Sequence, residues 1–338
     1  MNFAYREVCL DHDTGARHPE SPDRLRAIRK GLSECHGVEY VAPDDATEEQ
    51  VAAVHDADYV EEVQEFCADG GGDWDADTVA VEATWDAAVA SAGMANWVAE
   101  RALAGDDGRD TPFALCRPPG HHAVTGDAMG FCFFNNAAVA AQHALDDLDV
   151  DRVAIVDWDV HHGNGTEEIF EDRGDVFYVS IHEDGIYPGT GDLTETGTGE
   201  GAGTNMNVPF PPGTTTSGFL AAVEELVVPA FEAFDPELVL ISAGFDAHEH
   251  DPISRLRVST EGYGTLTDRF RTYADRTDTA LGFVLEGGYG LDTLTDSVRT
   301  VHKVFDGYTP TESDEEVQEA AREVIADVRD QGFDLGDD

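Results

Sequence analysis

The sequence predicts a single α/β domain in which a central parallel β-sheet is flanked by helices. Three observations favour this class. Short apolar runs alternate with longer helical stretches, the runs end in polar or glycine-rich turns, and no repeat or linker divides the 338 residues. Because ligands bind beyond the carboxyl ends of the strands in such sheets, we expect the active site at that edge.

The elements follow from apolar runs and helical periodicity. Strands are predicted over 112–116, 152–158, 238–243 and 281–285. Helices are predicted over 79–104, 136–148, 216–234 and 260–274. The glycine-rich segment 185–203 is predicted to be a long surface loop. We expect the domain to span residues 1–310, followed over 311–338 by an acidic helix capped by Ser313 and a solvated tail.

The charge of the chain is strongly unbalanced, with 70 acidic against 20 basic side chains and a net charge of −50. Such a field repels phosphates, so direct binding of nucleic acid or of an anionic membrane is disfavoured. Only Lys30 and Lys303 are lysines. This composition resembles that of proteins from salt-loving archaea, where concentrated salt screens surface charge. An acidic surface that attracts a cationic partner is the alternative.

The cysteines and the N-terminus point to the cellular compartment. Five widely spaced cysteines without a CxxC pair favour neither a disulfide framework nor a thiolate zinc site. The chain begins without a basic and apolar leader, and no run approaches the ~20 apolar residues that span a bilayer. We therefore expect a soluble cytoplasmic protein.

Polar residues follow each predicted strand at its carboxyl end. They are His121 and His122 after the first strand, Asp157, Asp159 and His161 at the end of the second, Asp246 after the third and Tyr289 after the fourth. Since parallel strands end at one edge of a sheet, these side chains should converge. Packing alone does not explain such convergence.

The run VDWDVHHGNG suggests a metal site. Strand alternation would place Asp157, Asp159 and His161 on one face, where neighbouring carboxylates repel unless a divalent cation neutralises them. Zinc accepts this donor set in open catalytic sites, and Asp246 can supply a third ligand. Taken singly, each aspartate is equally typical of a helix cap.

The run RPPGHHA places two imidazoles in a turn, where both can reach one pocket. One can act as a general base while the other stabilises developing charge. Tyr289, after two glycines in LEGGYG, can donate a hydrogen bond to an oxyanion; alone it could equally be a packed tyrosine. Structural roles are expected for His12, His36, His55, His143 and His302.

Together, these motifs resemble the histone deacetylase family, which includes acetylpolyamine amidohydrolases and acetoin utilisation proteins. The resemblance covers about residues 5–308 and rests on HPESPDRL, DADT, RPPGHHA, GFCFFNN, DWDVHHGNGT, YPGTGD, SAGFDAH and LEGGYG. RPPGHHA, DWDVHHGNGT and LEGGY are similar to the class II branch.

The resemblance implies roles for individual residues. The implied zinc ligands are Asp159, His161 and Asp246; the implied catalytic residues are His121, His122 and Tyr289, with Asp157 orienting the first histidine and Asn164 beside the second. The implied substrate contacts are Phe131, Gly130, Tyr187 and, at the rim, Asp77, with Arg24 along an exit for acetate. The implied potassium site uses Asp157, Asp159, His161 and Ser180. Because an amide cannot raise a partner's pKa as a carboxylate does, the two histidines should differ in basicity.

The resemblance further implies zinc-dependent deacetylation of acetyl-lysine in proteins. A polyamine enzyme of the family would carry an acidic residue where Ile253 stands, although Glu249 and Asp251 are near enough to keep acetylated polyamines or other small amines as the alternative. Less favoured alternatives are an arginase-like hydrolase with two manganese ions and a catalytically silent acetyl-lysine-binding protein. An oligomer is compatible with the sequence.

Overall fold

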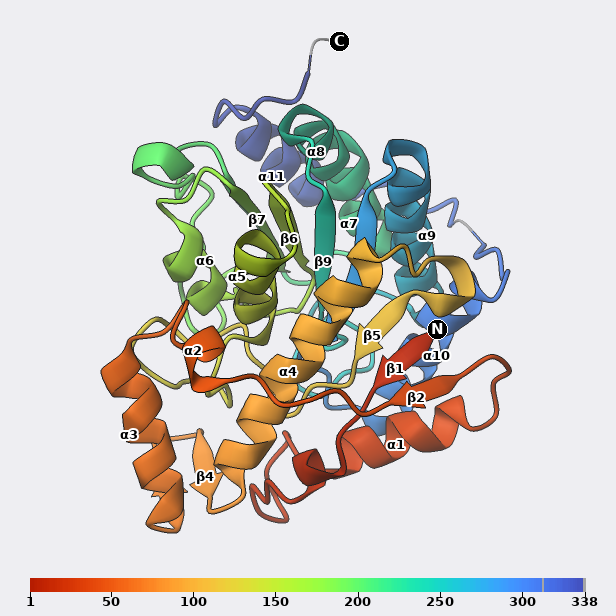
Figure 1. Ribbon diagram of the computed structural model, residues 1–338. Helices are drawn as coiled ribbons and strands as arrows, with labels where there is room; N and C mark the ends of the chain where they lie inside the picture. Colours follow the sequence, from red (N-terminus) through yellow and green to blue (C-terminus); the bar gives the residue numbers. More distant parts are fainter. Residues whose placement is uncertain (312, 337–338) are drawn as a thin grey trace.

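The computed structural model describes residues 1–311 and 313–336. Within them, eight parallel strands form one sheet in the order β2-β1-β5-β10-β9-β6-β7-β8, and β3 and β4 form a separate antiparallel pair (Figure 1). The strands are β1 (Asn2–Ala4), β2 (Glu39–Val41), β3 (Gly71–Asp73), β4 (Val79–Val81), β5 (Pro112–Ala114), β6 (Val153–Asp157), β7 (Val176–Glu183), β8 (Asn205–Phe210), β9 (Leu238–Ala243) and β10 (Ala280–Leu285).

Helices and short helical turns make up a further large part of the chain. The α-helices are α1 (Asp23–Leu32), α2 (Glu48–Val51), α3 (Ala57–Ala68), α4 (Thr84–Leu103), α5 (Asn136–Asp147), α6 (Asn164–Phe170), α7 (Thr216–Ala222), α8 (Val228–Phe234), α9 (Thr260–Thr277), α10 (Leu291–Phe305) and α11 (Glu319–Arg329). Short 3-10 turns are η1 (Glu7–Leu10), η2 (Gly108–Asp110) and η3 (Gly199–Gly201), and a π-helical turn, η4 (Val223–Val227), joins α7 to α8.

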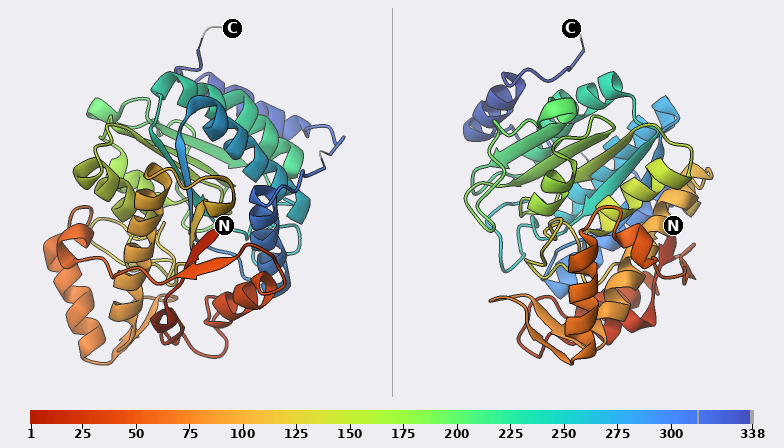
Figure 2. Two further views of the ribbon diagram at one scale, coloured as in Figure 1. Left: turned by 45° about the vertical axis from the view of Figure 1, so that its right-hand side comes forward. Right: turned by 60° about the vertical axis from the view of Figure 1, so that its left-hand side comes forward.

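Helices cover both faces of the sheet. The neighbours α4 and α5 lie on one face, while α9 and α10 pack together on the other (Figure 2). The strands β6, β7 and β9 between these layers are buried at every position. Burial on both faces explains their continuous apolar character and confirms the predicted fold class.

The predicted elements differ from the observed ones mainly at their ends. All four predicted strands are present, and β1, β2, β7 and β8 extend the sheet beyond them. The helix predicted from residue 79 begins instead at Thr84, because residues 79–81 pair with β3. The predicted loop 185–203 contains only the 3-10 turn η3.

The acidic C-terminal helix begins later than predicted. Ser313 does not cap it; the Ser313 hydroxyl accepts a hydrogen bond from the Glu315 N–H, and α11 starts after Gln318. The Gln318 side chain donates to the Thr215 hydroxyl at 2.8 Å, and α11 packs on α7 and β8. Docking on the domain therefore sets the helix start.

Two further features concern the described residues as a whole. The five cysteines carry free thiols, and four of them are buried. No helix within residues 1–311 and 313–336 has the length and apolar character needed to cross a membrane.

Candidate functional site

The candidate site lies beyond the carboxyl ends of four adjacent strands. In the sheet β5, β10, β9 and β6 are neighbours, and all run in the same direction. The segments that follow them carry the polar residues predicted to converge. The structure brings these segments together at one edge of the sheet.

An Asp–His–Asp group forms the centre of the site. Asp159, His161 and Asp246 each offer one donor atom, and these atoms lie within 4.8 Å of one another. His161 Nδ1 is 3.0 Å from Asp159 Oδ1 and 3.4 Å from Asp246 Oδ2. Both aspartates are fully buried, and Asp246 Oδ2 has no hydrogen-bond partner among the described residues. A buried carboxylate oxygen without a partner favours a bound cation.

The route by which these residues converge differs from the prediction. Strand β6 ends at Asp157, so strand alternation does not extend to Asp159 and His161. Instead Asp157 Oδ1 accepts a hydrogen bond from the Asp159 N–H, and Asp159 Oδ1 accepts one from the His161 N–H, each at 3.0 Å. Two successive Asx turns therefore bring the alternate side chains together.

Glycines leave room for the two carboxylates. A Cβ atom on Gly287 would lie 2.2 Å from Asp246 Oδ2 and 2.5 Å from Asp159 Oδ2, and one on Gly244 would lie 2.1 Å from Asp159 Oδ2. The Gly287 N–H also donates to Asp159 Oδ2 at 2.8 Å. The glycines in LEGGYG and SAGFDAH thus shape the acidic centre.

The paired histidines lie beside this centre with different partners. Their ring centroids are 4.0 Å apart. His121 Nδ1 is 2.8 Å from Asp157 Oδ2, and His122 Nδ1 is 2.8 Å from Asn164 Oδ1. Burial lowers the pKa of His121, but the neighbouring carboxylates outweigh burial and raise it to about 10. Burial and the adjacent His121 hold the pKa of His122 well below its usual range.

The acidic centre is electrostatically strained in the chain alone. Burial raises the pKa of Asp246, and the charge of Asp159 raises it further. Burial also acts to lower the pKa of His161, but the close contacts and negative charges of both aspartates raise it to about 10. A divalent cation in this position would replace the protons that the group otherwise holds.

Aromatic rings stand next to Tyr289 and His122. The Phe131 ring centroid is 5.9 Å from that of Tyr289, and the Tyr187 ring centroid is 5.1 Å from that of His122. Tyr187 is 39% exposed, so it reaches the surface. A Cβ atom on Gly130 would come within 2.4 Å of the His122 ring. Only glycine fits there.

The other predicted residues lie around this group. Asp77 is partly buried near the surface, and its carbonyl oxygen is 2.9 Å from His18 Nε2. Ser180 on β7 pairs in register with Asp157 on β6. The five histidines predicted to be structural make contacts elsewhere or are exposed; they are His12, His36, His55, His143 and His302.

Sequence reasoning named Arg24 but missed the buried charges around it and the buried Glu286. Glu20 pairs with Arg24 at 3.3 Å and with Arg117 at 2.8 Å, and all three side chains are fully buried. Glu286 Oε2 accepts hydrogen bonds from the N–H groups of Gly120 and His121, and burial raises the pKa of Glu286 to about 7. The signal available was their position inside HPESPDRL, RPPGHHA and LEGGYG.

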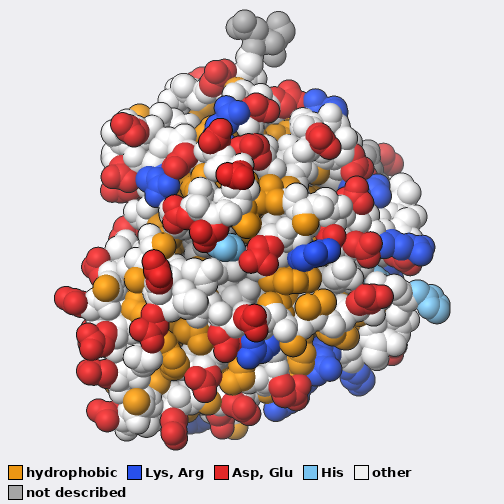
Figure 3. Space-filling model, in the orientation of Figure 1, with side chains coloured by type: hydrophobic (Ala, Val, Ile, Leu, Met, Phe, Trp, Pro, Cys, Tyr) orange, Lys and Arg blue, Asp and Glu red, His pale blue; other side chains and the backbone are white. Residues whose placement is uncertain are grey.

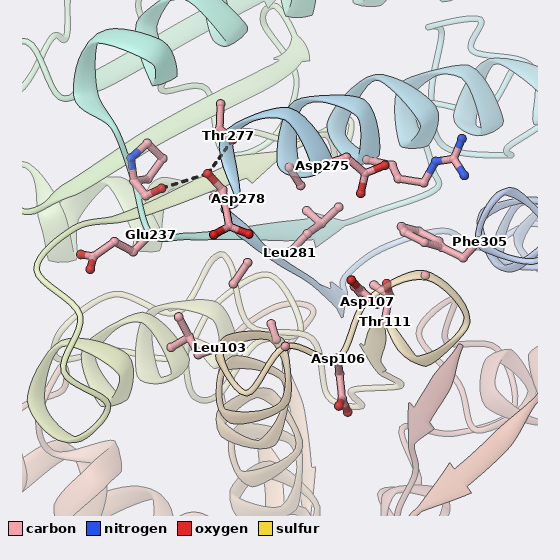
Figure 4. Close-up of a pocket in the computed structure, with 18 of the residues that line it drawn as sticks. Leu103, Asp106, Asp107, Thr111, Glu237, Asp275, Thr277, Asp278, Leu281 and Phe305 are labelled. Carbon is pink, nitrogen blue, oxygen red and sulfur yellow. Dashed lines mark hydrogen bonds between the residues drawn. The ribbon is translucent and has the colours of Figure 1, made fainter.

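A second hollow lies away from this site. Its volume is about 520 Å³, and it opens at the amino-terminal ends of β5, β9 and β10, where Leu103, Glu237 and Leu281 line it (Figure 4). None of the predicted site residues lines it.

On the face drawn in Figure 3, acidic side chains are scattered widely and basic ones are few.

Comparisons with known proteins show which family the sequence and the fold resemble. A model of the histone deacetylase domain matches residues 18–305. The histone deacetylase-like amidohydrolase of Pseudomonas aeruginosa is 36% identical over 310 residues, which are 85% of this chain and 81% of that protein. A probable deacetylase of Archaeoglobus fulgidus is 37% identical over 296 residues, 86% of this chain and 81% of the relative. The crystal structure of the HDA15 HD domain superposes with a TM-score of 0.90 at 36% identity, covering 98% of this chain and 93% of that one.

Proposed function

The chain belongs to the histone deacetylase family of amidohydrolases, and on that premise we propose that it uses zinc to remove acetyl groups from lysine side chains of proteins. The observation that carries this proposal is the meeting of an Asp–His–Asp donor set with the His121–His122 pair. A donor set alone could hold a structural ion, whereas an imidazole pair beside it supplies the proton transfers that amide hydrolysis requires.

The donor set fits zinc. Two carboxylates and one imidazole, from Asp159, Asp246 and His161, leave coordination positions open for substrate and water, as in catalytic zinc sites. The described residues hold one such group, which suits one metal ion rather than the two of an arginase-like enzyme. When bound, zinc would polarise the amide carbonyl and lower the pKa of the attacking water.

We assign the proton transfers to His122. Its Nδ1 faces the amide oxygen of Asn164 and therefore carries the proton, which leaves the lone pair of Nε2 free. A pKa well below the usual range keeps the ring neutral and ready to accept a proton from the attacking water. The same nitrogen then gives that proton to the departing amine, so that addition of one water yields acetate and a free amine.

His121 has the complementary role. The charges of Asp157 and Asp159 and the hydrogen bond to Asp157 raise the pKa of His121, which favours the positively charged ring. This charge opposes the negative charge that develops as water attacks. Tyr289 would stabilise the amide oxygen on which this negative charge develops. Its hydroxyl has no hydrogen-bond partner among the described residues and is free to donate to an oxyanion.

The remaining predicted residues surround the substrate in this proposal. Phe131 and Tyr187 would hold the aliphatic chain, Gly130 would leave space beside His122, and Asp77 would contact the substrate backbone at the rim. A potassium ion would lie behind the metal site and use Asp157, Asp159, His161 and Ser180.

The choice between acetyl-lysine and acetylpolyamine rests on the segment after Asp246. Ile253 is 40% exposed and apolar. The Asp251 carboxylate is buried and accepts hydrogen bonds from three backbone N–H groups, so it is not available to bind an amine. Only Glu249 remains as an exposed carboxylate here. This arrangement favours acetyl-lysine.

The test is a comparison of substrates at high salt with the purified, zinc-loaded protein. We expect turnover of acetylated lysine peptides to exceed that of acetylspermidine. We also expect Tyr289→Phe to lower kcat by roughly a hundredfold to a thousandfold, since one oxyanion donor is lost. The control is Tyr308→Phe, because Tyr308 is exposed and its hydroxyl bonds, among the described residues, to Glu261 alone. A strong polyamine preference would overturn the substrate, and undiminished turnover by Tyr289→Phe would overturn the mechanism.

A further inference from the structure

The turn that carries Tyr289 depends on outside contacts for its position. It contains the consecutive glycines Gly287 and Gly288, and Gly288 has a φ of +118°, a conformation that glycine adopts without strain. Three neighbouring segments hold the first half of the turn, and one of their contacts is the hydrogen bond from the Phe245 N–H to the Gly287 carbonyl at 3.0 Å. The Gly287 N–H donates to Asp159 Oδ2 at 2.8 Å, and Arg24 Nε donates to the Gly288 carbonyl at 2.7 Å.

One carboxylate holds the second half of the turn. Asp251 Oδ2 accepts hydrogen bonds from the N–H groups of Tyr289, at 2.8 Å, and Gly290, at 3.0 Å. Its other oxygen, Oδ1, accepts from the Ile253 N–H at 3.1 Å. Asp251 therefore ties the catalytic turn to the segment at the rim of the site.

Asp251 is placed where a carboxylate is costly unless it is well bonded. Its side chain is only 7% exposed, and its own N–H donates to the His248 carbonyl. Three N–H groups and the amino-terminal end of α10, which begins at Leu291, offset part of the loss of solvation, and burial still raises the pKa of the Asp251 carboxyl. Each of these contacts requires an acceptor oxygen on the side chain.

The Tyr289 side chain itself is held only by ring contacts. The Phe131 ring lies at 5.9 Å, the Arg24 guanidinium lies at 5.1 Å from the ring centroid, and the hydroxyl bonds to none of the described residues. Since no side-chain hydrogen bond aims the phenol, its direction follows from the backbone position.

We propose that Asp251 is a positioning residue for Tyr289: it fixes the backbone from which the phenol reaches the reacting carbonyl, and it links that backbone to the rim at Ile253. This inference rests on the function proposed above for Tyr289. It assigns to Asp251 no contact with substrate or metal.

The test is a double-mutant cycle. Asp251→Ala should lower kcat by roughly 10- to 100-fold with little change in KM, because a small displacement of a catalytic group is costly. In a Tyr289→Phe background the same change should lower kcat less than about twofold, since there is no hydroxyl left to misplace. Equal losses in both backgrounds, or a change in KM alone, would overturn the proposal.

A matched control uses another carboxylate that holds consecutive N–H groups. Glu237 accepts from Asp151 and Arg152, at the opposite end of the sheet. Glu237→Ala should leave kcat unchanged. Asp251→Asn keeps the size of the side chain and one acceptor oxygen, so it should fold and lose less activity than Asp251→Ala; an undiminished kcat in both Asp251 variants would contradict the inference.

A second measurement separates this inference from the proposed function. Amide hydrogen exchange, followed by mass spectrometry of metal-free protein, should become faster in peptides covering residues 286–295 of Asp251→Ala and stay unchanged in Glu237→Ala. Unchanged exchange in that segment would overturn the inference even in an active enzyme. A wild-type protein that cleaves no acetylated amine would overturn the proposed function instead, while the exchange result would still show whether Asp251 holds the turn.

Discussion

A single methyl group at Gly287 should disable the metal centre. The ideal Cβ of Gly287→Ala would lie 2.2 Å from Asp246 Oδ2 and 2.5 Å from Asp159 Oδ2, two of the three donors proposed to hold zinc. Both carboxylates are fully buried and bonded to backbone N–H groups, so neither can swing away freely. The substitution therefore acts on the metal site rather than on the surface.

The magnitude follows from the distances. Carbon and oxygen atoms that are not bonded approach no closer than about 3 Å, so at least one carboxylate must move by roughly 0.8 Å, several times the ~0.2 Å tolerance of metal–ligand distances. Changes to groups that support metal ligands cost about 10- to 100-fold in affinity. We expect a loss at the upper end of this range, which corresponds to about 3 kcal/mol.

The assay is competition for zinc against a chromophoric chelator. Gly126→Ala is the control, since its Cβ would meet only the Asp56 side chain, at 3.2 Å. Unfolding of the metal-free proteins should be compared in parallel, so that loss of affinity is separated from loss of fold. If Gly287→Ala bound zinc within threefold of the wild type, the assignment of Asp159 and Asp246 as ligands would be refuted.

Three other predictions concern pKa values and charge. Asn164→Asp should raise the pKa of His122 and move the acidic limb of the kcat profile to higher pH, because a carboxylate would replace the amide 2.8 Å from the ring; an unmoved profile would argue against His122 as the base. Burial lowers the pKa of His55 to about 4, and the ring bonds to the Val124 carbonyl and the Asn135 N–H. The unfolded chain therefore binds more protons than the folded chain between about pH 6.5 and 4. The stability that neutral His55 contributes is fully present above pH 6.5 and is lost as the pH falls. In denaturant unfolding, the free energy of unfolding of His55→Gln should decrease by about 3 kcal/mol less than that of the wild type between pH 7 and 4. Finally, we propose that the acidic surface is an adaptation to salt, so the unfolding temperature should rise with KCl concentration; an unfolding temperature independent of KCl would argue against it.

The sequence was sufficient for the fold class and for the edge of the sheet at which the site lies. Apolar runs such as β9 and β10 are continuous because helices cover both of their faces, so periodicity alone finds them. The three-residue strands β1 and β2 carry too little pattern to be recognised, whereas β5, equally short, was found because its apolar run continues to Cys116. The start of α11 depends on docking against Thr215, which no local pattern contains.

The site was predictable as a set of residues but not as a geometry. The prediction that Asp157, Asp159 and His161 lie together was right, but its reason was wrong. Two Asx turns, and not strand alternation, bring these side chains together. Buried supports were missed because an isolated Glu or Asp is usually exposed or caps a helix. Glu286 is recognised as a support only once the N–H groups of Gly120 and His121 are seen to meet it.

The buried carboxylates near the site form two groups, one that would bind the metal ion and one that holds backbone turns. Asp159 and Asp246 lie close together, and the unpaired oxygen of Asp246 leaves that group short of positive charge. Asp251 and Glu286 are not part of that donor group, and each accepts two N–H groups of the turn that it holds. Removing the first kind should abolish metal binding, whereas removing the second should leave the metal in place and displace a catalytic side chain. The net charge of −50 reflects neither kind, since these few buried groups are a small part of the 70 acidic residues.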